Sequence, residues 1–196
     1  MILGITGGVG SGKSTVLNYL ENKHHAFIIE ADAVAKYIME PGHIVYEKVL
    51  KAFPELKLDD NGFIDRAYFA SIVFNDEDKL KLLNSIVHPG VKTEIKSLIN
   101  KSQSENEHRL IVIEAALLIE DGYKAICDEI WYVYCEKEKR IKRLMESRGY
   151  TREKSLEIMK NQMSEADFKK NTNAIVDNTH NEDDTHKQID KLLDKM

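Results

Sequence analysis

Residues 7–15 read Gly7-Gly8-Val9-Gly10-Ser11-Gly12-Lys13-Ser14-Thr15, which matches the phosphate-binding pattern G-x-x-x-x-G-K-S/T. A short apolar run at residues 2–5 precedes this stretch, and residues 14–20 have the apolar spacing of a helix. The pattern therefore lies between a predicted strand and a predicted helix, the context in which it binds phosphate. We predict that it holds a nucleoside triphosphate. A glycine-rich turn without function is the weaker interpretation, because both the Gly-Lys-Ser ending of the pattern and its position between a strand and a helix are those of a phosphate-binding loop.

The residue types of this stretch each suit one part of a polyphosphate site. Glycines let the backbone come close to the phosphates, so that main-chain amides and the helix start point at anionic oxygens. Lys13 would neutralise the β and γ oxygens, and the Ser14 hydroxyl would bind the Mg²⁺ that bridges them. The nucleotide-binding residues predicted here are Gly8, Gly10, Ser11, Gly12, Lys13, Ser14 and Thr15.

Composition limits the class of protein. The chain has 196 residues, 42% of them hydrophobic and 31% charged, which suits one compact core with an inserted subdomain. A net charge of -5 argues against general binding to nucleic acid or membrane surfaces. Cys127 and Cys135 lack the spacing of metal ligands or of a disulfide framework, so buried, reduced thiols are expected. Without a leader segment or a long apolar run, the sequence predicts a soluble, cytoplasmic protein.

Strand-like and helix-like segments alternate along the chain. After the first strand, short β-branched or aromatic runs predict four more strands, at Ala26–Glu30, Leu110–Glu114, Ile130–Tyr134 and Ala174–Asp177. Helical patterns lie between them, at Lys137–Ser147, at Arg152–Met163, and in a closing helix marked by Ile189, Leu192 and Leu193. Such alternation predicts a parallel sheet that is covered by helices on both faces and binds ligands at the carboxyl ends of its strands.

One interval is too long for an ordinary crossover between strands. Residues 34–101 have a mostly helical pattern, punctuated by Pro41-Gly42, Asn61-Gly62 and Pro89-Gly90. We expect an inserted lobe that binds the acceptor substrate. Two polar stretches, Lys101–His108 and Thr179–Thr185, are expected to be exposed connections.

Asp32 follows the second predicted strand, where a carboxylate can take part in phosphoryl transfer. Such a group can orient an acceptor hydroxyl and accept its proton. Asp before Ala33-Val34-Ala35 also suits the N-cap of a helix. The local sequence alone leaves these two interpretations equally open.

Basic residues gather around Gly149 in a chain that is acidic overall. They are Arg140, Lys142, Arg143, Arg148 and Arg152. A mobile clamp that pairs with the transferred phosphoryl group and excludes water is one interpretation, and a solvated helix face is the other. His88 and Glu114 are ambiguous in the same way: Glu114 could reach the Mg²⁺ through water or cap the next segment.

Taken together, the sequence motifs resemble those of the dephospho-CoA kinase family over nearly the whole chain. The opening Gly4–Thr15 and the segment Ala31–Lys36, followed by Pro41-Gly42, are similar to family motifs. Shorter signatures follow in the family's order: Asp65-Arg66, Val73-Phe74, His88-Pro89, Leu117–Glu120, Arg143-Leu144, Gln162-Met163 and Asn178.

The resemblance implies a reaction and roles for particular residues. ATP would phosphorylate the 3′-hydroxyl of the ribose in dephospho-CoA, with Asp32 as the base. Lys13, Arg143 and Arg148 would surround the transferred group, while Lys36, Arg66 and His88 would contact the acceptor. The implied cofactors are ATP and Mg²⁺, and the implied protein is a monomer or weak homo-oligomer that binds neither nucleic acid nor membrane.

The implied fold is a single α/β domain of the P-loop NTPase type. It has three layers, a five-stranded parallel sheet, a helical acceptor-binding insertion and a small lid. The core would comprise residues of about 1–33, 109–136 and 165–196, the lobe about 34–101 and the lid about 137–164.

Some positions depart from the family pattern. The family usually has aspartate at Glu30, arginine at Lys36, proline at Ala116 and glutamine at Arg140, and one fewer residue between Arg143 and Gly149. Lysine lacks the bidentate fork of arginine, so the contact of Lys36 with the acceptor would differ.

Two other functions share parts of these patterns. A nucleoside or nucleoside monophosphate kinase would have the same phosphate loop, lobe and lid. A regulatory GTPase would need a guanine-binding N-K-x-D or T-K-x-D segment, which the sequence lacks, and its D-x-x-G at residues 59–62 does not follow a strand-like run.

Overall fold

The computed structural model describes residues 1–105 and 108–196, which form two compact units. Of the described residues, 1–28 and 108–196 belong to one unit, here called the core unit. Residues 29–105 belong to the other, here called the helical unit.

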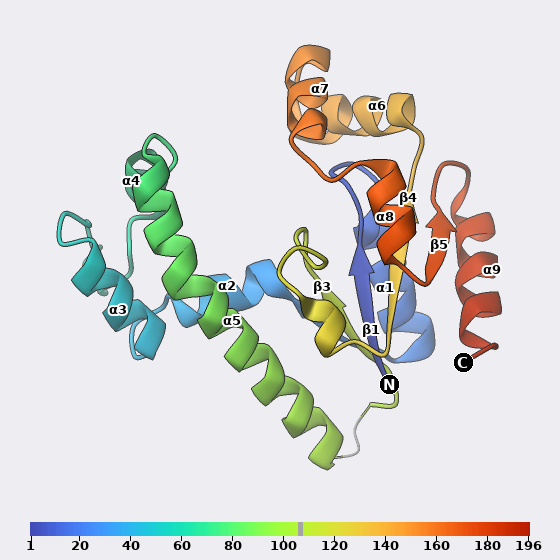
Figure 1. Ribbon diagram of the computed structural model, residues 1–196, viewed down its shortest axis with the longest axis horizontal. Helices are drawn as coiled ribbons and strands as arrows, with labels where there is room; N and C mark the ends of the chain where they lie inside the picture. Colours follow the sequence, from blue (N-terminus) through green and yellow to red (C-terminus); the bar gives the residue numbers. More distant parts are fainter. Residues whose placement is uncertain (106–107) are drawn as a thin grey trace. The chain divides into compact units, whose positions relative to one another are not determined.

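The core unit is built around a five-stranded sheet (Figure 1). Its strands are β1 (Ile2–Thr6), β2 (Phe27–Glu30), β3 (Ile111–Glu114), β4 (Glu129–Tyr134) and β5 (Ala174–Asp177), in the spatial order β2-β3-β1-β4-β5. β1 pairs in parallel with both β3 and β4, and β4 pairs in parallel with β5. The predicted parallel sheet is confirmed, and each predicted strand boundary lies within one residue of the observed one. Because the strands are parallel, residues that follow β1, β3 and β5 come out at the same edge.

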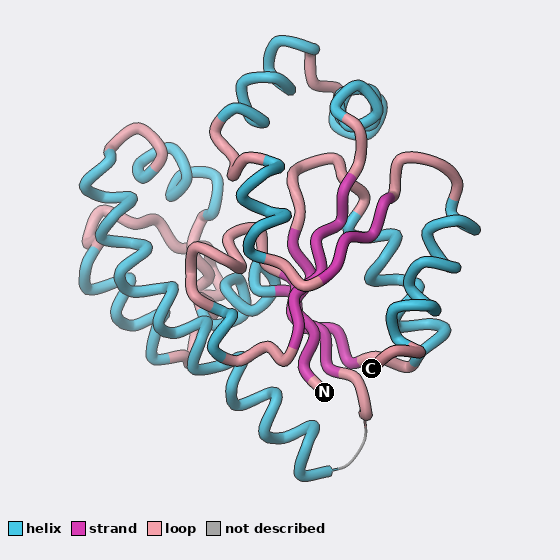
Figure 2. The backbone as a smooth tube through the Cα atoms, turned by 45° about the vertical axis from the view of Figure 1, so that its right-hand side comes forward, coloured by secondary structure: helices cyan, strands magenta, loops and turns pink. Residues whose placement is uncertain are grey.

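Helices cover the sheet because alternate residues of its strands are apolar on opposite faces. Trp131 and Val133 of β4 belong to the buried cluster that includes Leu17 of α1 (Lys13–His24) and Ile189 of α9 (Glu182–Leu193). Tyr132, between them in sequence, points the other way and stacks on Phe168 of α8 (Glu165–Asn171), with ring centroids 4.7 Å apart. Figure 2 shows helices on both sides of the magenta strands.

Two further helices of the core unit, α6 (Lys137–Arg148) and α7 (Arg152–Lys160), follow β4. The turn between them contains Gly149, which has a φ of 63° and ends α6. Figure 1 shows this helix pair beyond the carboxyl end of β4. We call α6, α7 and the turn up to residue 164 the lid. A short 3-10 helix, Tyr123–Ala125, lies between β3 and β4.

The helical unit contains α2 (Ala31–Ile38), α3 (Ile44–Ala52), α4 (Arg66–Val73) and the long α5 (Glu77–Glu105). The other three helices all contact α5. Its buried apolar residues are Val87, Val91, Ile95 and Ile99, a stripe with a spacing of four residues. A Cβ at Gly90 would lie 2.5 Å from Cγ2 of Val45, so glycine permits the close approach of α3 to α5.

Several boundaries differ from the sequence predictions. Pro89-Gly90 was expected to interrupt the helical pattern, yet α5 continues through both residues. The helix also includes Lys101–Glu105, which were expected to begin an exposed connection; residues 106 and 107 of that connection lie outside the described residues. The second expected connection is shorter than predicted, since Thr179 and Thr185 are buried and α9 begins at Glu182.

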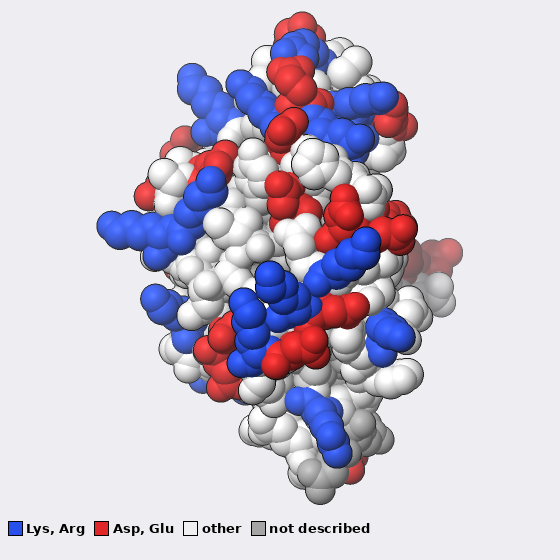
Figure 3. Space-filling model, turned by 90° about the vertical axis from the view of Figure 1, so that its right-hand side faces the viewer, with Lys and Arg blue, Asp and Glu red and all other residues white. Residues whose placement is uncertain are grey.

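On the face drawn in Figure 3, acidic and basic side chains lie interspersed.

The two cysteines differ in their burial. Cys135 is buried as expected, whereas Cys127 is only half-buried, and both are free thiols. Burial raises the pKa of the Cys127 thiol to about 12, with a further contribution from Asp128.

Among the helices of the described chain, none combines the length and the apolar character needed to cross a membrane.

Candidate active site

The phosphate loop, residues 7–15, joins the carboxyl end of β1 to the start of α1. Gly12 is the N-cap of α1 and has a φ of 85°, a left-handed conformation that favours glycine. Glycine has no side chain to cap the helix, so main-chain N–H groups at the start of α1 stay available to a ligand. The positive end of the helix dipole and these donors together form a site for anions.

Asn178, which follows β5, is hydrogen-bonded to the phosphate loop. Its Nδ2 donates to the carbonyl oxygens of Ser11, at 2.9 Å, and of Gly12, at 3.3 Å. Its Oδ1 accepts a hydrogen bond of 3.1 Å from Oγ1 of Thr185 on α9. A Cβ at Gly12 would lie 2.1 Å from Asn178 Nδ2, so this position of the asparagine requires glycine at residue 12.

Lys13 is held in a fixed position within the loop. Its Nζ donates to the carbonyl oxygen of Gly7 at 2.9 Å and lies 3.5 Å from Oε1 of Glu114, at the end of β3. The Lys13 side chain is only 18% exposed. The ammonium group therefore lies at the edge of the sheet where β1 and β3 both end.

The loop also contains a buried hydroxyl that lacks a partner. Ser11 Oγ is the buried side-chain polar atom for which no hydrogen bond exists within the described residues. A buried hydroxyl without a partner costs free energy, which a ligand can recover by bonding to it.

The donor set suits a magnesium ion that is held mainly by substrate. Ser14 is exposed at the second residue of α1, and Glu114 ends β3. The described residues contain no cluster of three or more His, Cys, Asp or Glu that could hold a metal alone. Mg²⁺ typically binds through one or two protein oxygens, several waters and the substrate's phosphates, so a single hydroxyl is compatible with it.

Arg143, on α6, contacts the phosphate loop at Ser11. Its Nη1 donates to the carbonyl oxygen of Ser11 at 3.1 Å and contacts Sγ of Cys135 at 3.4 Å. Its Nη2 donates to the carbonyl oxygen of Asn178 at 2.9 Å. The guanidinium thus links the lid, the loop and the end of β5.

Arg140, one turn earlier on α6, contacts the same loop at Val9. Its Nε donates to the Val9 carbonyl oxygen at 2.8 Å, and its Nη2 donates to Oε1 of Gln162 at 2.9 Å. The same Gln162 oxygen accepts the Val9 N–H at 3.0 Å. Burial lowers the pKa of Arg140 from its ordinary value, with the nearby Glu165 and Tyr132 acting in the opposite direction.

The other basic residues of the proposed clamp lie elsewhere. Arg152 forms a two-pronged ion pair with Glu138, at 2.7 and 2.8 Å, which joins α7 to α6. Lys142 is 70% exposed and lies 3.8 Å from Glu146 on the same helix. Of the two interpretations of the basic residues, a solvated helix face is therefore the one that the structure supports for Arg152 and Lys142.

Arg148 is exposed at the last residue of α6. Its guanidinium carbon lies 6.0 Å from the centre of the Tyr150 ring. The structure therefore places Arg148 beside the turn of the lid.

Asp32 lies in the first turn of α2, within the helical unit, and is exposed. The N-cap of α2 is Glu30, and no side chain caps this helix. Of the two interpretations of Asp32, the N-cap is therefore wrong, because the helix begins one residue before it. Lys36 is exposed in the last turn of the same helix.

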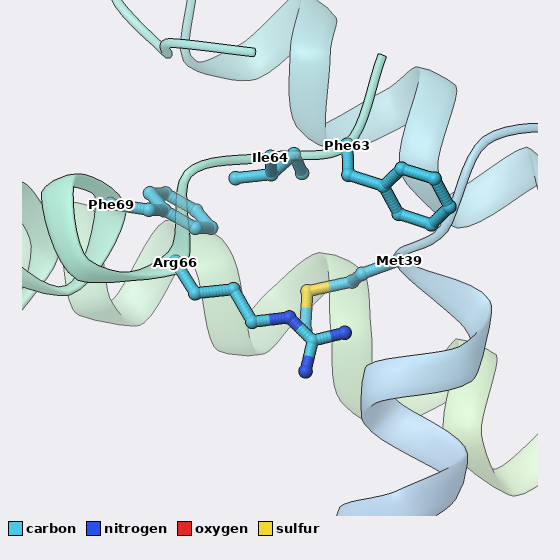
Figure 4. A pocket seen from close by; sticks show the side chains of 5 residues that line it. All are labelled: Met39, Phe63, Ile64, Arg66 and Phe69. Carbon is cyan, nitrogen blue, oxygen red and sulfur yellow. The ribbon is translucent and has the colours of Figure 1, made fainter. Parts of the chain in front are cut away.

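Arg66 lines a small pocket in the helical unit (Figure 4). The pocket has a volume of about 30 Å³, room for about one water molecule, and its other lining residues are Met39, Phe63, Ile64 and Phe69. Arg66 Nη2 lies 3.7 Å from Glu40 Oε1, so the guanidinium is partly neutralised there. His88 is half-buried in the middle of α5.

Two residues that contact the phosphate loop, Asn178 and Gln162, had been noted only as short family signatures without a role in the site, whereas Arg140 was part of the predicted clamp. Asn178 follows a predicted strand, so its place at the ligand-binding edge could have been inferred from the parallel topology. Gln162 lies 153 residues from Val9 in sequence, and no local pattern indicates such a contact.

These features define the class of the protein. A parallel sheet with a phosphate loop between β1 and α1, a lysine fixed inside that loop and a lid whose arginines contact it is the arrangement of P-loop kinases. The sequence profile of the dephospho-CoA kinase family matches residues 1–184. The chain belongs to that family, and therefore to the phosphotransferases.

Individual proteins that are similar to this chain support the same family assignment. The dephospho-CoA kinase of Carboxydothermus hydrogenoformans is 40% identical over 194 residues, which cover 99% of this chain and 93% of the relative. A crystal structure of a Thermus thermophilus protein is 31% identical, with a TM-score of 0.80 over 100% of this chain and 97% of that one. The dephospho-CoA kinase of Campylobacter jejuni has the same fold, with a TM-score of 0.74 at 24% identity, over 99% and 96% of the two chains. Neither a nucleoside kinase nor a GTPase is favoured by these findings.

Proposed function

We propose that this chain transfers the γ-phosphoryl group of ATP to the 3′-hydroxyl of the ribose in dephospho-CoA, giving coenzyme A and ADP. The observation that carries the proposal is the phosphate loop, in which Lys13 Nζ donates a hydrogen bond to Gly7 O. The chain that contains this loop belongs to the dephospho-CoA kinase family. The fixed ammonium can stabilise charge on the transferred group without rearrangement, which is how preorganised sites accelerate such steps.

In this reaction the acceptor oxygen bonds to the γ-phosphorus as the bond to the departing ADP oxygen breaks. Asp32 accepts the proton of the acceptor hydroxyl, and Lys13 and Arg143 face the charge on the phosphate oxygens. Arg148 is proposed as a further lid contact to the nucleotide. Mg²⁺, held by Ser14 and the phosphates, would neutralise the β and γ oxygens.

The remaining proposals concern the acceptor and the setting. Lys36, Arg66 and His88 would contact dephospho-CoA from the helical unit. The protein would work in the cytoplasm as a monomer or weak homo-oligomer, with a small-molecule substrate and without a nucleic-acid or membrane partner.

Asp32→Asn tests the proposed base. The substitution keeps the size of the side chain but removes the proton acceptor, so we expect turnover to fall by about 10²-fold or more while ATP affinity changes little. Because Asp32 is exposed and caps no helix, thermal stability should stay near that of the wild type. Coupled ADP release with dephospho-CoA as the acceptor measures the effect.

Asp60→Asn is the matched control, because Asp60 is an exposed carboxylate of the same helical unit. We expect it to have wild-type turnover. Wild-type turnover of Asp32→Asn itself would refute the assignment of the base, and faster wild-type phosphorylation of AMP, UMP, CMP or a nucleoside than of dephospho-CoA would refute the proposed acceptor.

A further inference from the structure

Arg140 is a half-buried cation that contacts only neutral groups. Its partners are the Val9 carbonyl oxygen and the Gln162 amide oxygen. Within residues 1–105 and 108–196, it forms no ion pair with a carboxylate. Glu165 is near enough to affect its pKa, but that carboxylate lies 2.6 Å from Lys169. Burying a charge without a counter-charge is costly, which is why such groups commonly meet an anion in function.

The guanidinium lies directly over the phosphate loop. A Cβ at Gly8 would be 2.2 Å from Arg140 Nη2 and 3.0 Å from Nη1. Gly8 is not among the glycines with a positive φ, so its backbone does not require glycine. The absence of a side chain at Gly8 instead leaves the space that Arg140 occupies.

Gln162 fixes the orientation of this guanidinium. Its Oε1 accepts hydrogen bonds from both Val9 N and Arg140 Nη2. With Arg140 Nε bonded to Val9 O, both main-chain polar groups of Val9 are bonded to lid residues. Arg140 Nη1 is left without a hydrogen bond inside the described part of the chain, beside a loop built to bind phosphate.

We propose that Arg140 contacts the polyphosphate of the nucleotide, as a cation of the site additional to Lys13 and Arg143, and that Gln162 is a positioning residue that holds it over Gly8. The proposal rests on the proposed function only in requiring that the loop binds MgATP. Arg140 would thereby have a role in this chain at a position where the family usually has a neutral glutamine.

Calorimetry with MgATP and with magnesium pyrophosphate tests the contact. Arg140→Met keeps the length of the side chain and removes its charge, so we expect both ligands to bind about tenfold to a hundredfold more weakly. Lys139→Met, on the exposed face of the same helix, is the control and should change both affinities by less than about twofold. Unchanged binding of both ligands to Arg140→Met would overturn the proposal, as would weakened binding of MgATP alone, since pyrophosphate lacks the nucleoside.

Gln162→Glu tests whether Gln162 positions the Arg140 guanidinium or only attaches the lid to the phosphate loop. The carboxylate can still accept both hydrogen bonds but also neutralises Arg140, so we expect weaker pyrophosphate binding at a thermal stability close to that of the wild type. If Gln162 served only to attach the lid, pyrophosphate would bind as well as to the wild type, and the positioning role would be wrong.

A double-mutant cycle with Gly8→Ala tests the geometry. The methyl group should displace the guanidinium and weaken pyrophosphate binding in the wild-type background, but add little in the Arg140→Met background. Equal losses in the two backgrounds would contradict the proposed contact. A wild-type protein that binds MgATP yet forms no phosphorylated dephospho-CoA would refute the proposed function and leave this inference standing.

Discussion

At the scale of single residues, Gly12 is the position in the phosphate loop where a side chain is least tolerable. Its φ is 85°, and a Cβ would lie 2.1 Å from Asn178 Nδ2. We expect Gly12→Ala to lower the free energy of unfolding by about 1–3 kcal/mol and to abolish measurable MgATP binding. Urea unfolding and calorimetry measure the two effects. Wild-type affinity in this variant would mean that the loop does not hold the nucleotide as described.

The second prediction at this scale concerns the ammonium group of Lys13 and its effect on turnover. Lys13→Ala removes a charge that lies at the loop before any ligand arrives, so we expect kcat to fall by about 10²-fold or more, with the fold retained. Lys23→Ala, which removes an exposed lysine from the last turn of the same helix, should leave turnover unchanged. A folded Lys13→Ala protein with normal turnover would contradict the phosphate role.

Sequence patterns predicted some single-residue features and could not predict others. The loop pattern is local, so its residues could be read directly from the chain. The basic residues of the lid could not be separated, because Arg140 and Arg152 are alike in sequence. Only the folded chain shows that Arg152 is paired with Glu138 while Arg140 lies over Gly8.

At the scale of elements, α1 and α9 are joined by a cluster around Asp190. Its carboxylate accepts hydrogen bonds from Tyr19, at 3.0 Å to each oxygen, and lies 2.8 Å from His24 Nε2. Partial burial acts to raise the pKa of Asp190, but these bonds outweigh it and hold the pKa below its ordinary value of 3.8.

The lowered pKa of Asp190 predicts a pH dependence. A carboxyl group whose pKa is depressed in the folded state stabilises the fold above its unfolded pKa, and this contribution is lost as pH falls through the folded pKa. We therefore expect the stability difference between the wild type and Asp190→Asn to be present at about pH 5 and to shrink as pH falls below 3.8. Urea midpoints at a series of pH values measure this difference, and a gap that grows towards low pH would contradict the assignment.

The bounds of α5 and α9, and of the connections beside them, were the part of the fold that the sequence predicted least well. Pro89 suggested an interruption because proline removes a helix hydrogen bond, yet the apolar stripe from Val87 to Ile99 continues on both sides of it. Tertiary packing against that stripe outweighs the local preference. The same reason applies to Thr185, which looked like part of a polar loop but is buried beside Asn178.

At the scale of the whole molecule, alternation of strands and helices was enough to predict the parallel sheet, because each strand is a short apolar run between amphipathic helices. The length and helical pattern of residues 34–101 suggested an inserted lobe, and in the described chain residues 29–105 form a compact unit of their own. The acceptor was inferred from family resemblance, since a fold alone does not define a substrate.

Mass spectrometry of the product formed from ATP and dephospho-CoA by the wild-type protein is the most direct test of the central claim. We predict that dephospho-CoA gains the mass of one phosphoryl group while ATP is converted to ADP. Unmodified dephospho-CoA after incubation with a folded protein that binds MgATP would contradict the account.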